Sequence, residues 1–126
     1  MTPSPLIVVD HTVAATRYRR AMTNEELIER AGRALVAAAP PASRVILFGS
    51  HARGDTRAGS DLDFLVIEPD ADHSGLESVR LRRALRELPA SIDVVVVSRD
   101  VAERRSKVPG TMVDRALREG RVIAGP

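Results

Sequence analysis

Two aspartates at the start of an apolar run are the residues of this chain best placed to do chemistry. Asp61 and Asp63 lead into the run 64–67, which is short and rich in branched residues, so it predicts a buried strand. Side chains alternate faces along a strand, so the two carboxylates should point the same way. Carboxylates this close repel each other unless a cation lies between them, and divalent ions prefer oxygen ligands. The pair therefore predicts a metal site at the head of this strand.

A glycine and a serine end the preceding apolar run, and they are candidates for binding phosphate. The run 45–48 stops at Gly49 and Ser50, and ten residues separate Ser50 from Asp61. Glycine lets the backbone approach a phosphate closely, and serine offers an amide and a hydroxyl as donors. An ordinary strand-to-helix turn would use the same two residues. The carboxylates that follow favour the phosphate interpretation, because a phosphate cradle beside a metal site is the chemistry of nucleotidyl transfer.

Asp93 and Arg53 complete the candidate site. Asp93 interrupts an apolar run at 92–97, and a carboxylate there must find a partner or face water. If this strand pairs beside the one that follows Asp61, three carboxylates could bind two divalent ions about 3.5–4 Å apart, as in in-line phosphoryl transfer. Arg53 could contact phosphate or hold its own loop through backbone carbonyls, and the sequence favours neither role.

Composition argues against several other kinds of protein. The 126 residues contain no Cys, which removes disulfides, thiolate zinc sites and thiol nucleophiles. Neither a His-Ser-Asp set nor a His-Glu-x-x-His spacing supports a hydrolase. No apolar run approaches a membrane span and no signal-peptide pattern begins the chain, so we expect a cytoplasmic protein without membrane contact. The net charge is +2 and the arginines are spread along the chain, so direct binding of nucleic acid is not indicated.

Helical and strand patterns predict an α+β fold, a small mixed β-sheet packed with helices. Residues 1–22 are the least readable part, with one apolar run at 6–9 that could form a short strand, and they are set apart as a leader of uncertain structure; residues 23–126 form the domain. Thr23 with Glu26, and Ser74 with Glu77, fit capping boxes. The expected elements, in chain order, are a helix from Thr23 to Pro40, strands at 44–48 and 62–68, a helix from Ser74 to Leu88, a strand at 92–97, helices from Ser98 to Lys107 and from Pro109 or Thr111 to Gly120, and a short strand at 122–123.

Three motifs together resemble a known superfamily. Gly-Ser-His-Ala-Arg-Gly at 49–54, Ser-Asp-Leu-Asp-Phe at 60–64 and Ile-Asp-Val at 92–94 resemble the DNA polymerase beta-like nucleotidyltransferases. Within that superfamily the chain is similar to minimal nucleotidyltransferase domain proteins, which are often antitoxins encoded beside HEPN-domain toxins. The resemblance covers residues 24–123 and implies the nucleotidyltransferase fold.

The resemblance also implies an enzyme that uses ATP and magnesium. Asp61 and Asp63 would ligate Mg²⁺, Asp93 would complete the site and serve as a general base, and Gly49 and Ser50 would bind the triphosphate. Two ions would neutralise the phosphates while an acceptor hydroxyl attacks the α-phosphorus and pyrophosphate leaves.

Three functions remain open at this point. The first is an active nucleotidyltransferase that modifies a macromolecule such as a HEPN-type toxin, and the second is a binding module that neutralises a toxin by contact. The third is an enzyme that modifies a small molecule such as an antibiotic. The presence of Asp61, Asp63 and Asp93 favours activity over binding alone. The short chain disfavours the third function, because such enzymes resemble this domain plus a helical domain that holds the acceptor.

Overall fold

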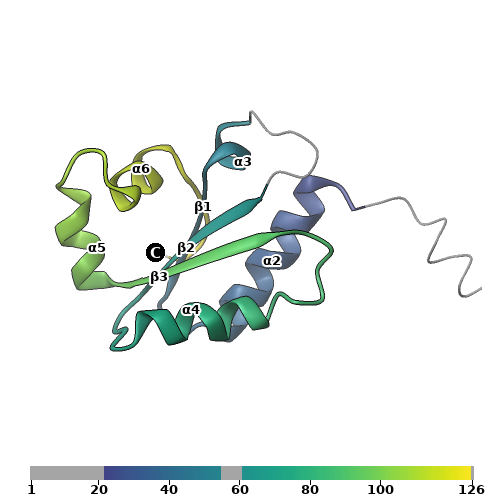
Figure 1. The fold of residues 1–126 in the computed structure, drawn as a ribbon, viewed down its shortest axis with the longest axis horizontal. Coiled ribbons are helices and arrows are strands. Elements are labelled where there is room, and N and C mark those ends of the chain that lie inside the picture. Colours follow the sequence, from purple (N-terminus) through teal and green to yellow (C-terminus); the bar gives the residue numbers. More distant parts are fainter. Residues whose placement is uncertain (1–21, 55–60, 126) are drawn as a thin grey trace, which may run out of the picture.

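The computed structural model describes residues 22–54 and 61–125, which form one mixed sheet with helices on both faces (Figure 1). The rest of the expected leader and the segment 55–60, which includes Asp55, lie outside these described residues. Within them, no helix has the length and apolar character needed to cross a bilayer. The elements, in chain order, are α2 (Asn24–Ala38), β1 (Arg44–Phe48), α3 (Ser50–Arg53), β2 (Leu62–Glu68), α4 (Ser74–Arg83), β3 (Ile92–Ser98), α5 (Arg99–Ser106), α6 (Met112–Glu119) and β4 (Arg121–Ala124).

The sheet combines antiparallel and parallel pairs in the strand order β3-β2-β1-β4. β1 is antiparallel to both β2 and β4, whereas β2 and β3 are parallel. A parallel pair needs a crossover, and α4 supplies it. The register pairs Leu62 with Ile92 and Asp63 with Asp93, so both parallel strands begin at the same end of the sheet. The expected α+β fold with a small mixed sheet is confirmed.

Successive side chains on the strands point to opposite faces of the sheet and pack into two hydrophobic cores. α2 and α4 cover one face of the sheet, and α5 and α6 cover the other (Figure 1). On β2, Phe64 packs into the first core and Leu65 into the second. Because neighbours on a strand point to opposite faces, Asp63 lies on the face of Leu65. Its register partner Asp93 lies beside it on that same face.

Local sequence signals set most helix ends. The Thr23 hydroxyl accepts a hydrogen bond from the Glu26 amide at 3.1 Å, and the Glu26 carboxylate accepts one from the Thr23 amide at 2.8 Å. The first capping box is therefore confirmed. Ser98 and Thr111 cap α5 and α6 in the same way, each by a hydroxyl that accepts from an amide in the first turn.

The second expected capping box is wrong. α4 does begin at Ser74, but its N-cap is His73, which makes no side-chain cap hydrogen bond among the described residues. Glu77 instead binds the Arg80 guanidinium through both oxygens, at 2.6 and 2.7 Å. A two-point, charge-assisted pair is stronger than a neutral cap, so the carboxylate turns towards the arginine.

α4 also ends earlier than expected, at Arg83 and not at Leu88. The chain continues to residue 88 in tighter turns, in which the Ala84 amide donates to the Leu81 carbonyl and the Leu88 amide donates to the Leu85 carbonyl, each at 3.0 Å. These turns bury Leu85, whose side chain is 3 % exposed. The packing of Leu85 against the sheet therefore decides the path of the chain before Pro89.

Candidate functional site

Strand pairing brings Asp63 and Asp93 together at the start of β2 and β3. They are direct register partners, with Asp63 half-buried and Asp93 exposed. Burial, followed by the charges of Asp93 and Asp61, raises the pKa of Asp63 above its ordinary value, while the charge of His51 lowers it. Neighbouring carboxylates that repel each other in this way are relieved by a bound cation.

Asp61 lies at the rim of this pair. It precedes the first residue of β2, its side chain is exposed, and its charge still reaches Asp63. Across residues 22–54 and 61–125, no group of three or more His, Asp or Glu side chains has the geometry to hold a metal ion. The structure thus brings Asp63 and Asp93 together and leaves Asp61 at their edge. The assignment of all three as metal ligands stays a prediction.

Gly49 brings the end of β1 against the Asp63 carboxylate. Phe48 is the register partner of Asp63, so the next residue along the chain lies close by. Gly49 has φ +79°, and a Cβ built on it would lie 2.6 Å from Asp63 Oδ2. A side chain here would strain the backbone and displace the carboxylate. Glycine at this position therefore keeps open the corner between the turn and the carboxylates.

Ser50 begins α3, directly after this corner. The Ala52 and Arg53 amides donate to the Gly49 carbonyl at 3.1 and 3.2 Å, and the Gly54 amide donates to the Ser50 carbonyl at 2.9 Å. Those three amides are occupied by the turn itself. The Ser50 amide and hydroxyl are the candidate donors to a phosphate, and this role also stays a prediction.

A cavity of about 130 Å³ adjoins Gly49 on the side of α6. The Arg53 guanidinium lies 3.9 Å from a Glu119 carboxylate oxygen, with the two side chains 49 % and 42 % exposed, so water weakens this contact. The volume is below the roughly 300 Å³ of pockets that enclose a drug-sized ligand. It leaves room for a phosphate group but not for a nucleoside. The lining residues are Phe48, Gly49, Arg53, Met112, Arg115, Ala116 and Glu119.

Arg115 is a candidate that sequence reasoning missed. It extends from α6 into the lining of the same cavity as Gly49 and Arg53, and its side chain is exposed. Arg115 and its neighbours in the sequence do not form a recognisable motif. Only the packing of α6 on β1 places this cation beside the Gly-Ser turn.

The larger hollows of the molecule lie away from the carboxylates. One of about 660 Å³ lies between α2 and β4, and one of about 370 Å³ lies between α4 and the start of β3. Neither is lined by Asp61, Asp63 or Asp93. The chemistry of the side chains therefore locates the candidate site better than cavity size does.

The donor set fits a hard divalent cation. Asp63 and Asp93 present carboxylate oxygens from adjacent strands, and Asp61 adds a third carboxylate at the rim. Oxygen ligands suit Mg²⁺, whereas the softer thiolate ligands are missing from a chain without Cys. By their chemistry, these three residues are the predicted ligands of the ion, and strand pairing brings together two of them, Asp63 and Asp93.

A turn with Gly-Ser after one strand and carboxylates on the next two strands of a mixed sheet is consistent with a domain for phosphoryl or nucleotidyl transfer. The family model for the nucleotidyltransferase domain matches residues 28–123, and the chain belongs to this family. The expected nucleotidyltransferase fold is thereby confirmed.

Three solved structures share the fold. A toxin–antitoxin with AMP-PNP is 20 % identical with a TM-score of 0.54, and the match covers 78 % of this chain and 73 % of that one. A nucleotidyltransferase-like protein from Sulfolobus solfataricus is 19 % identical with a TM-score of 0.52, covering 76 % and 75 %. A mutant of the toxin–antitoxin MntA-HpeT is 17 % identical with a TM-score of 0.52, covering 78 % and 73 %. No curated protein matches the sequence.

Proposed function

We propose that this chain is a metal-dependent nucleotidyltransferase that moves AMP from ATP onto a hydroxyl of a partner protein. Membership of the nucleotidyltransferase domain family supports transfer in general. The observation that carries the finer proposal is the corner where Gly49 meets Asp63, with Asp93 in register beside it. Gly49 thus adjoins the Asp63 carboxylate and also lines the small cavity on the side of α6, which has room for a phosphate.

Each residue of the corner has a separate task. Gly49 lets the backbone approach the phosphates, Ser50 donates hydrogen bonds to them, and Asp63 with Asp61 and Asp93 holds the metal. Bound Mg²⁺ would neutralise the charge that the triphosphate and the carboxylates share. Asp93 is exposed and therefore placed to accept the proton of an incoming hydroxyl. That oxygen forms the new bond to the α-phosphorus, and pyrophosphate takes the electrons of the broken bond.

A protein acceptor, specifically a HEPN-type toxin, fits the open site best. Asp61 and Asp93 are exposed at the end of the sheet, so a hydroxyl on the surface of another protein can reach them. Two of the similar structures are toxin–antitoxins, and one of these contains AMP-PNP. The small cavity beside Gly49 could not enclose a separate small-molecule acceptor.

Asp63→Asn tests this proposal. The protein is incubated with Mg²⁺, ATP labelled at its α-phosphate and the protein encoded by the neighbouring gene. We expect the label on the partner with wild type, and a rate at least roughly 100-fold lower with Asp63→Asn, because the variant removes a metal-binding charge. Asp70→Asn, at the opposite end of β2, is the matched control and should transfer at the wild-type rate. Wild-type transfer by Asp63→Asn would refute the metal assignment.

The same variant should remain folded. Because burial and like charge raise the pKa of Asp63, ionised Asp63 destabilises the metal-free fold at neutral pH. Asn removes that repulsion, so the melting temperature without metal should equal or exceed that of wild type. A large fall in melting temperature would mean that the loss of transfer reports misfolding.

Neutralisation of a toxin by contact is the second candidate. It is favoured by the toxin–antitoxin structures among the similar folds, and by the lack of a three-ligand metal group among the described residues. A test of Asp63→Asn for toxin neutralisation distinguishes the two functions. Neutralisation that survives without transfer supports contact, and neutralisation that is lost with transfer supports modification.

A further inference from the structure

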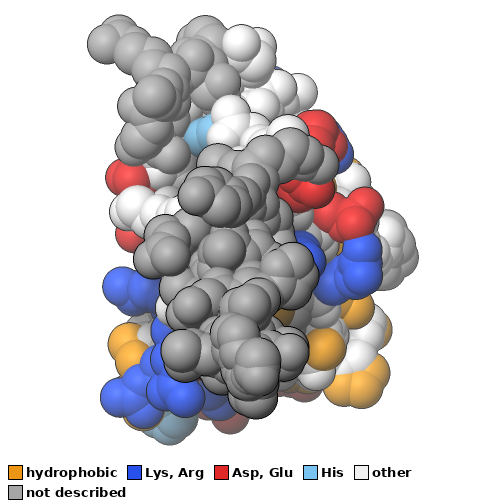
Figure 2. Space-filling view, turned by 90° about the vertical axis from the view of Figure 1, so that its right-hand side faces the viewer, with side chains coloured by type: hydrophobic (Ala, Val, Ile, Leu, Met, Phe, Trp, Pro, Cys, Tyr) orange, Lys and Arg blue, Asp and Glu red, His pale blue; other side chains and the backbone are white. Residues whose placement is uncertain are grey.

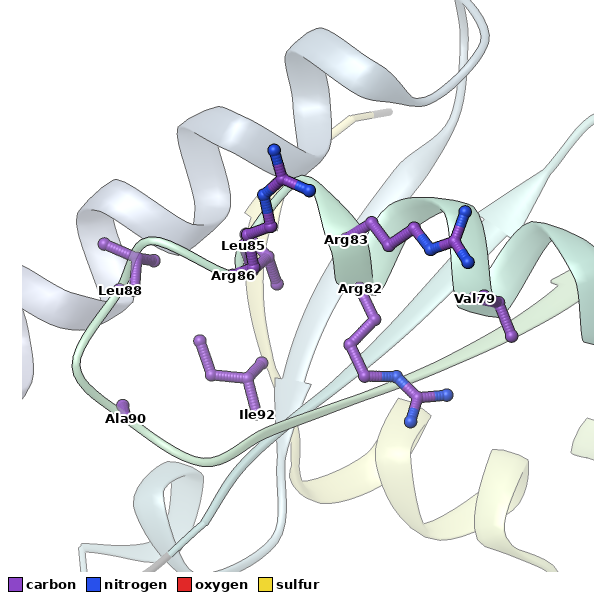
Figure 3. A pocket seen from close by; sticks show the side chains of 8 residues that line it. All are labelled: Val79, Arg82, Arg83, Leu85, Arg86, Leu88, Ala90 and Ile92. Atoms are coloured by element: carbon purple, nitrogen blue, oxygen red, sulfur yellow. The ribbon is translucent and has the colours of Figure 1, made fainter.

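An apolar hollow lies between the end of α4 and the start of β3. Leu85 and Ile92, which are 3 % and 8 % exposed, form its floor. Leu88 and Ala90 from the connecting segment close one side (Figure 3). Its volume of about 370 Å³ is enough to accept an apolar side chain of another molecule. We call this hollow the α4–β3 groove.

Three arginines of α4 and the turn after it form a basic rim around the groove. Arg82, Arg83 and Arg86 are exposed, and their side chains extend in different directions from the helix and the turn after it (Figure 3). Among the described residues, none of the three guanidinium groups has an ion-pair or hydrogen-bond partner. Arg80 on the same helix contrasts with them, because Glu77 and the Ala38 carbonyl hold its guanidinium.

The rim is part of a wider basic area at this end of the molecule. Figure 2 shows Lys and Arg side chains gathered at the lower left, with hydrophobic side chains among them. No carboxylate of the described segments lines the groove. Positive charge that these segments do not balance, around an apolar floor, is complementary to a ligand that is both acidic and apolar.

We propose that the α4–β3 groove docks an acidic segment of the acceptor protein, in which one or two large apolar residues lie between aspartates or glutamates. The apolar anchor fills the floor and the carboxylates pair with the arginine rim. Only the identity of this partner as the acceptor rests on the proposed function. Nucleic acid fits less well, because single strands bind by stacking on aromatic side chains. The aromatic residues of the described chain, Phe48 and Phe64, do not line the groove.

The groove and the carboxylates lie at the same end of the sheet, on opposite faces of one strand. Ile92 forms part of the groove floor, and Asp93, the next residue, points to the other face. β3 is an edge strand, so nothing in the sheet separates the two faces there. A partner anchored in the groove can therefore pass around this edge and present a hydroxyl near Asp93.

The partner should bind through side chains and not by adding a strand to the sheet. The Val96 amide on β3 donates to the Ser78 hydroxyl of α4 at 3.2 Å. That hydrogen bond occupies a backbone donor that an added strand would need. Val79, the residue after Ser78, lines the groove, so this hydrogen bond adjoins the groove through α4.

Selection from short random peptides displayed on phage tests the proposal directly. Wild-type protein is the bait, and the variant Arg82→Glu, Arg83→Glu, Arg86→Glu is used for counterselection. We expect enriched sequences with Leu, Ile or Phe flanked by Asp and Glu. A selected peptide, labelled for fluorescence anisotropy, should bind the reversed variant at least about tenfold more weakly. Replacing its apolar anchor by Ser should weaken binding by a similar factor.

A second triple variant controls for net charge. Arg30→Glu, Arg99→Glu, Arg105→Glu reverses three exposed arginines that do not line the groove. Its affinity should stay within about twofold of wild type, because exposed charges contribute little unless the ligand contacts them. Thermal melts of both variants should match wild type. No enrichment, a consensus without acidic residues, or equal losses in the two variants would overturn the proposal.

Two further measurements separate the alternatives. A labelled single-stranded RNA that binds wild type and loses affinity only in the groove variant would assign the groove to nucleic acid and overturn an acidic protein partner. Asp63→Asn should bind the selected peptide as wild type does. If wild type binds the peptide but transfers no nucleotide, the proposed function is contradicted and the groove assignment stands. If wild type transfers nucleotide but its peptide binding does not depend on the groove, the groove assignment is contradicted and the proposed function stands.

Discussion

Asp63 lies half-buried at the start of β2, with Asp93 beside it and Asp61 close enough to repel it. Burial and two like charges both disfavour its ionised form. A fold without use for the carboxylate would gain stability from a neutral residue here. Unfavourable electrostatics of this kind are concentrated at functional sites, where a ligand relieves them. Gly49 faces the same carboxylate, and replacing it with alanine tests whether the site needs a residue without a side chain there.

Gly49→Ala should impair transfer much more than stability. The new Cβ would lie 2.6 Å from Asp63 Oδ2 in a backbone with φ +79°, so the carboxylate or the turn must move. We expect a loss of stability on the order of 1–3 kcal/mol, because φ +79° with ψ −156° is a conformation that essentially only glycine adopts. Transfer should fall by at least roughly 100-fold, because displacement of about 1 Å near the reacting groups has that effect. Steady-state transfer rates and urea unfolding measure the two quantities.

Gly110→Ala is the matched control for that variant. Gly110 has φ +85°, but a Cβ there would meet no atom within 4 Å. The control therefore also places a Cβ at positive φ, but lacks the contact with Asp63. It should lose stability and keep wild-type transfer. Equal activity losses in the two variants would trace the effect of Gly49→Ala to strain alone.

β2 and α4 meet at a buried carboxyl group, at the opposite end of the strand from Asp63. Glu68 is 2 % exposed, and its Oε2 atom has no hydrogen-bond partner among the described residues. Burial, then a hydrogen bond with Glu77 and the charge of Glu77, raises the pKa of Glu68 to about 7, while Arg80 lowers it. Protonated Glu68 thus donates a hydrogen bond to Glu77, whose pKa the Arg80 guanidinium lowers. The hydrogen bond between Glu68 of β2 and Glu77 of α4 therefore depends on the protonation of Glu68.

Glu68→Gln should flatten the dependence of stability on pH. In wild type the folded state keeps the Glu68 proton up to about pH 7, whereas the unfolded chain releases it near 4.5. The folded state binds more protons in that window, so the free energy of unfolding falls as pH rises through it. Between pH 4.5 and about 7, the free energy of unfolding of wild type should fall by on the order of 2 kcal/mol. Glu68→Gln should not show this fall. Urea unfolding across the window, with exposed Glu87→Gln as control, measures this. A wild-type slope in Glu68→Gln would exclude Glu68 as the source.

At the scale of the whole molecule, the ATP site that we propose is an open end of the sheet and not an enclosed pocket among residues 22–54 and 61–125. Asp61 and Asp93 are exposed, and the cavity beside Gly49 has a volume of about 130 Å³. The chain alone can therefore contact the phosphates better than the nucleoside. Affinity for ATP should depend strongly on the metal, since carboxylates and phosphates repel each other without it.

Mg²⁺ and ATP together should raise the melting temperature more than the sum of their separate effects. A ligand at one hundred times its Kd adds about 2.7 kcal/mol, which corresponds to roughly 10 °C in a domain of this size. Thermal melts with Mg²⁺, with ATP and chelator, and with both measure the coupling. Asp63→Asn should lose the extra shift. Additive shifts in wild type would show that the metal and the phosphates do not share a site.

Much of this protein follows from patterns that span only a few residues. Short apolar runs bounded by turn residues predicted the positions of β1, β2 and β3, and hydroxyl caps predicted the starts of α2 and α5. For α6 the sequence left Pro109 and Thr111 open, and the structure has Thr111 as the cap. Such signals suffice because strand alternation and capping hydrogen bonds act between residues at most four apart. The motifs at 49–54, 60–64 and 92–94 also predicted the nucleotidyltransferase family, which the family match confirms.

Tertiary structure decided which of these residues meet. The crossover through α4 sets the register that places Asp93 beside Asp63, and the packing of α6 brings Arg115 to Gly49. The failed cap at Ser74 has the same origin, because Glu77 finds Arg80 and the buried Glu68. These contacts join segments whose separation along the chain carries no periodic signal. Burial and register, which depend on the whole sheet, therefore determine the site, its charge and the arginine-rimmed groove.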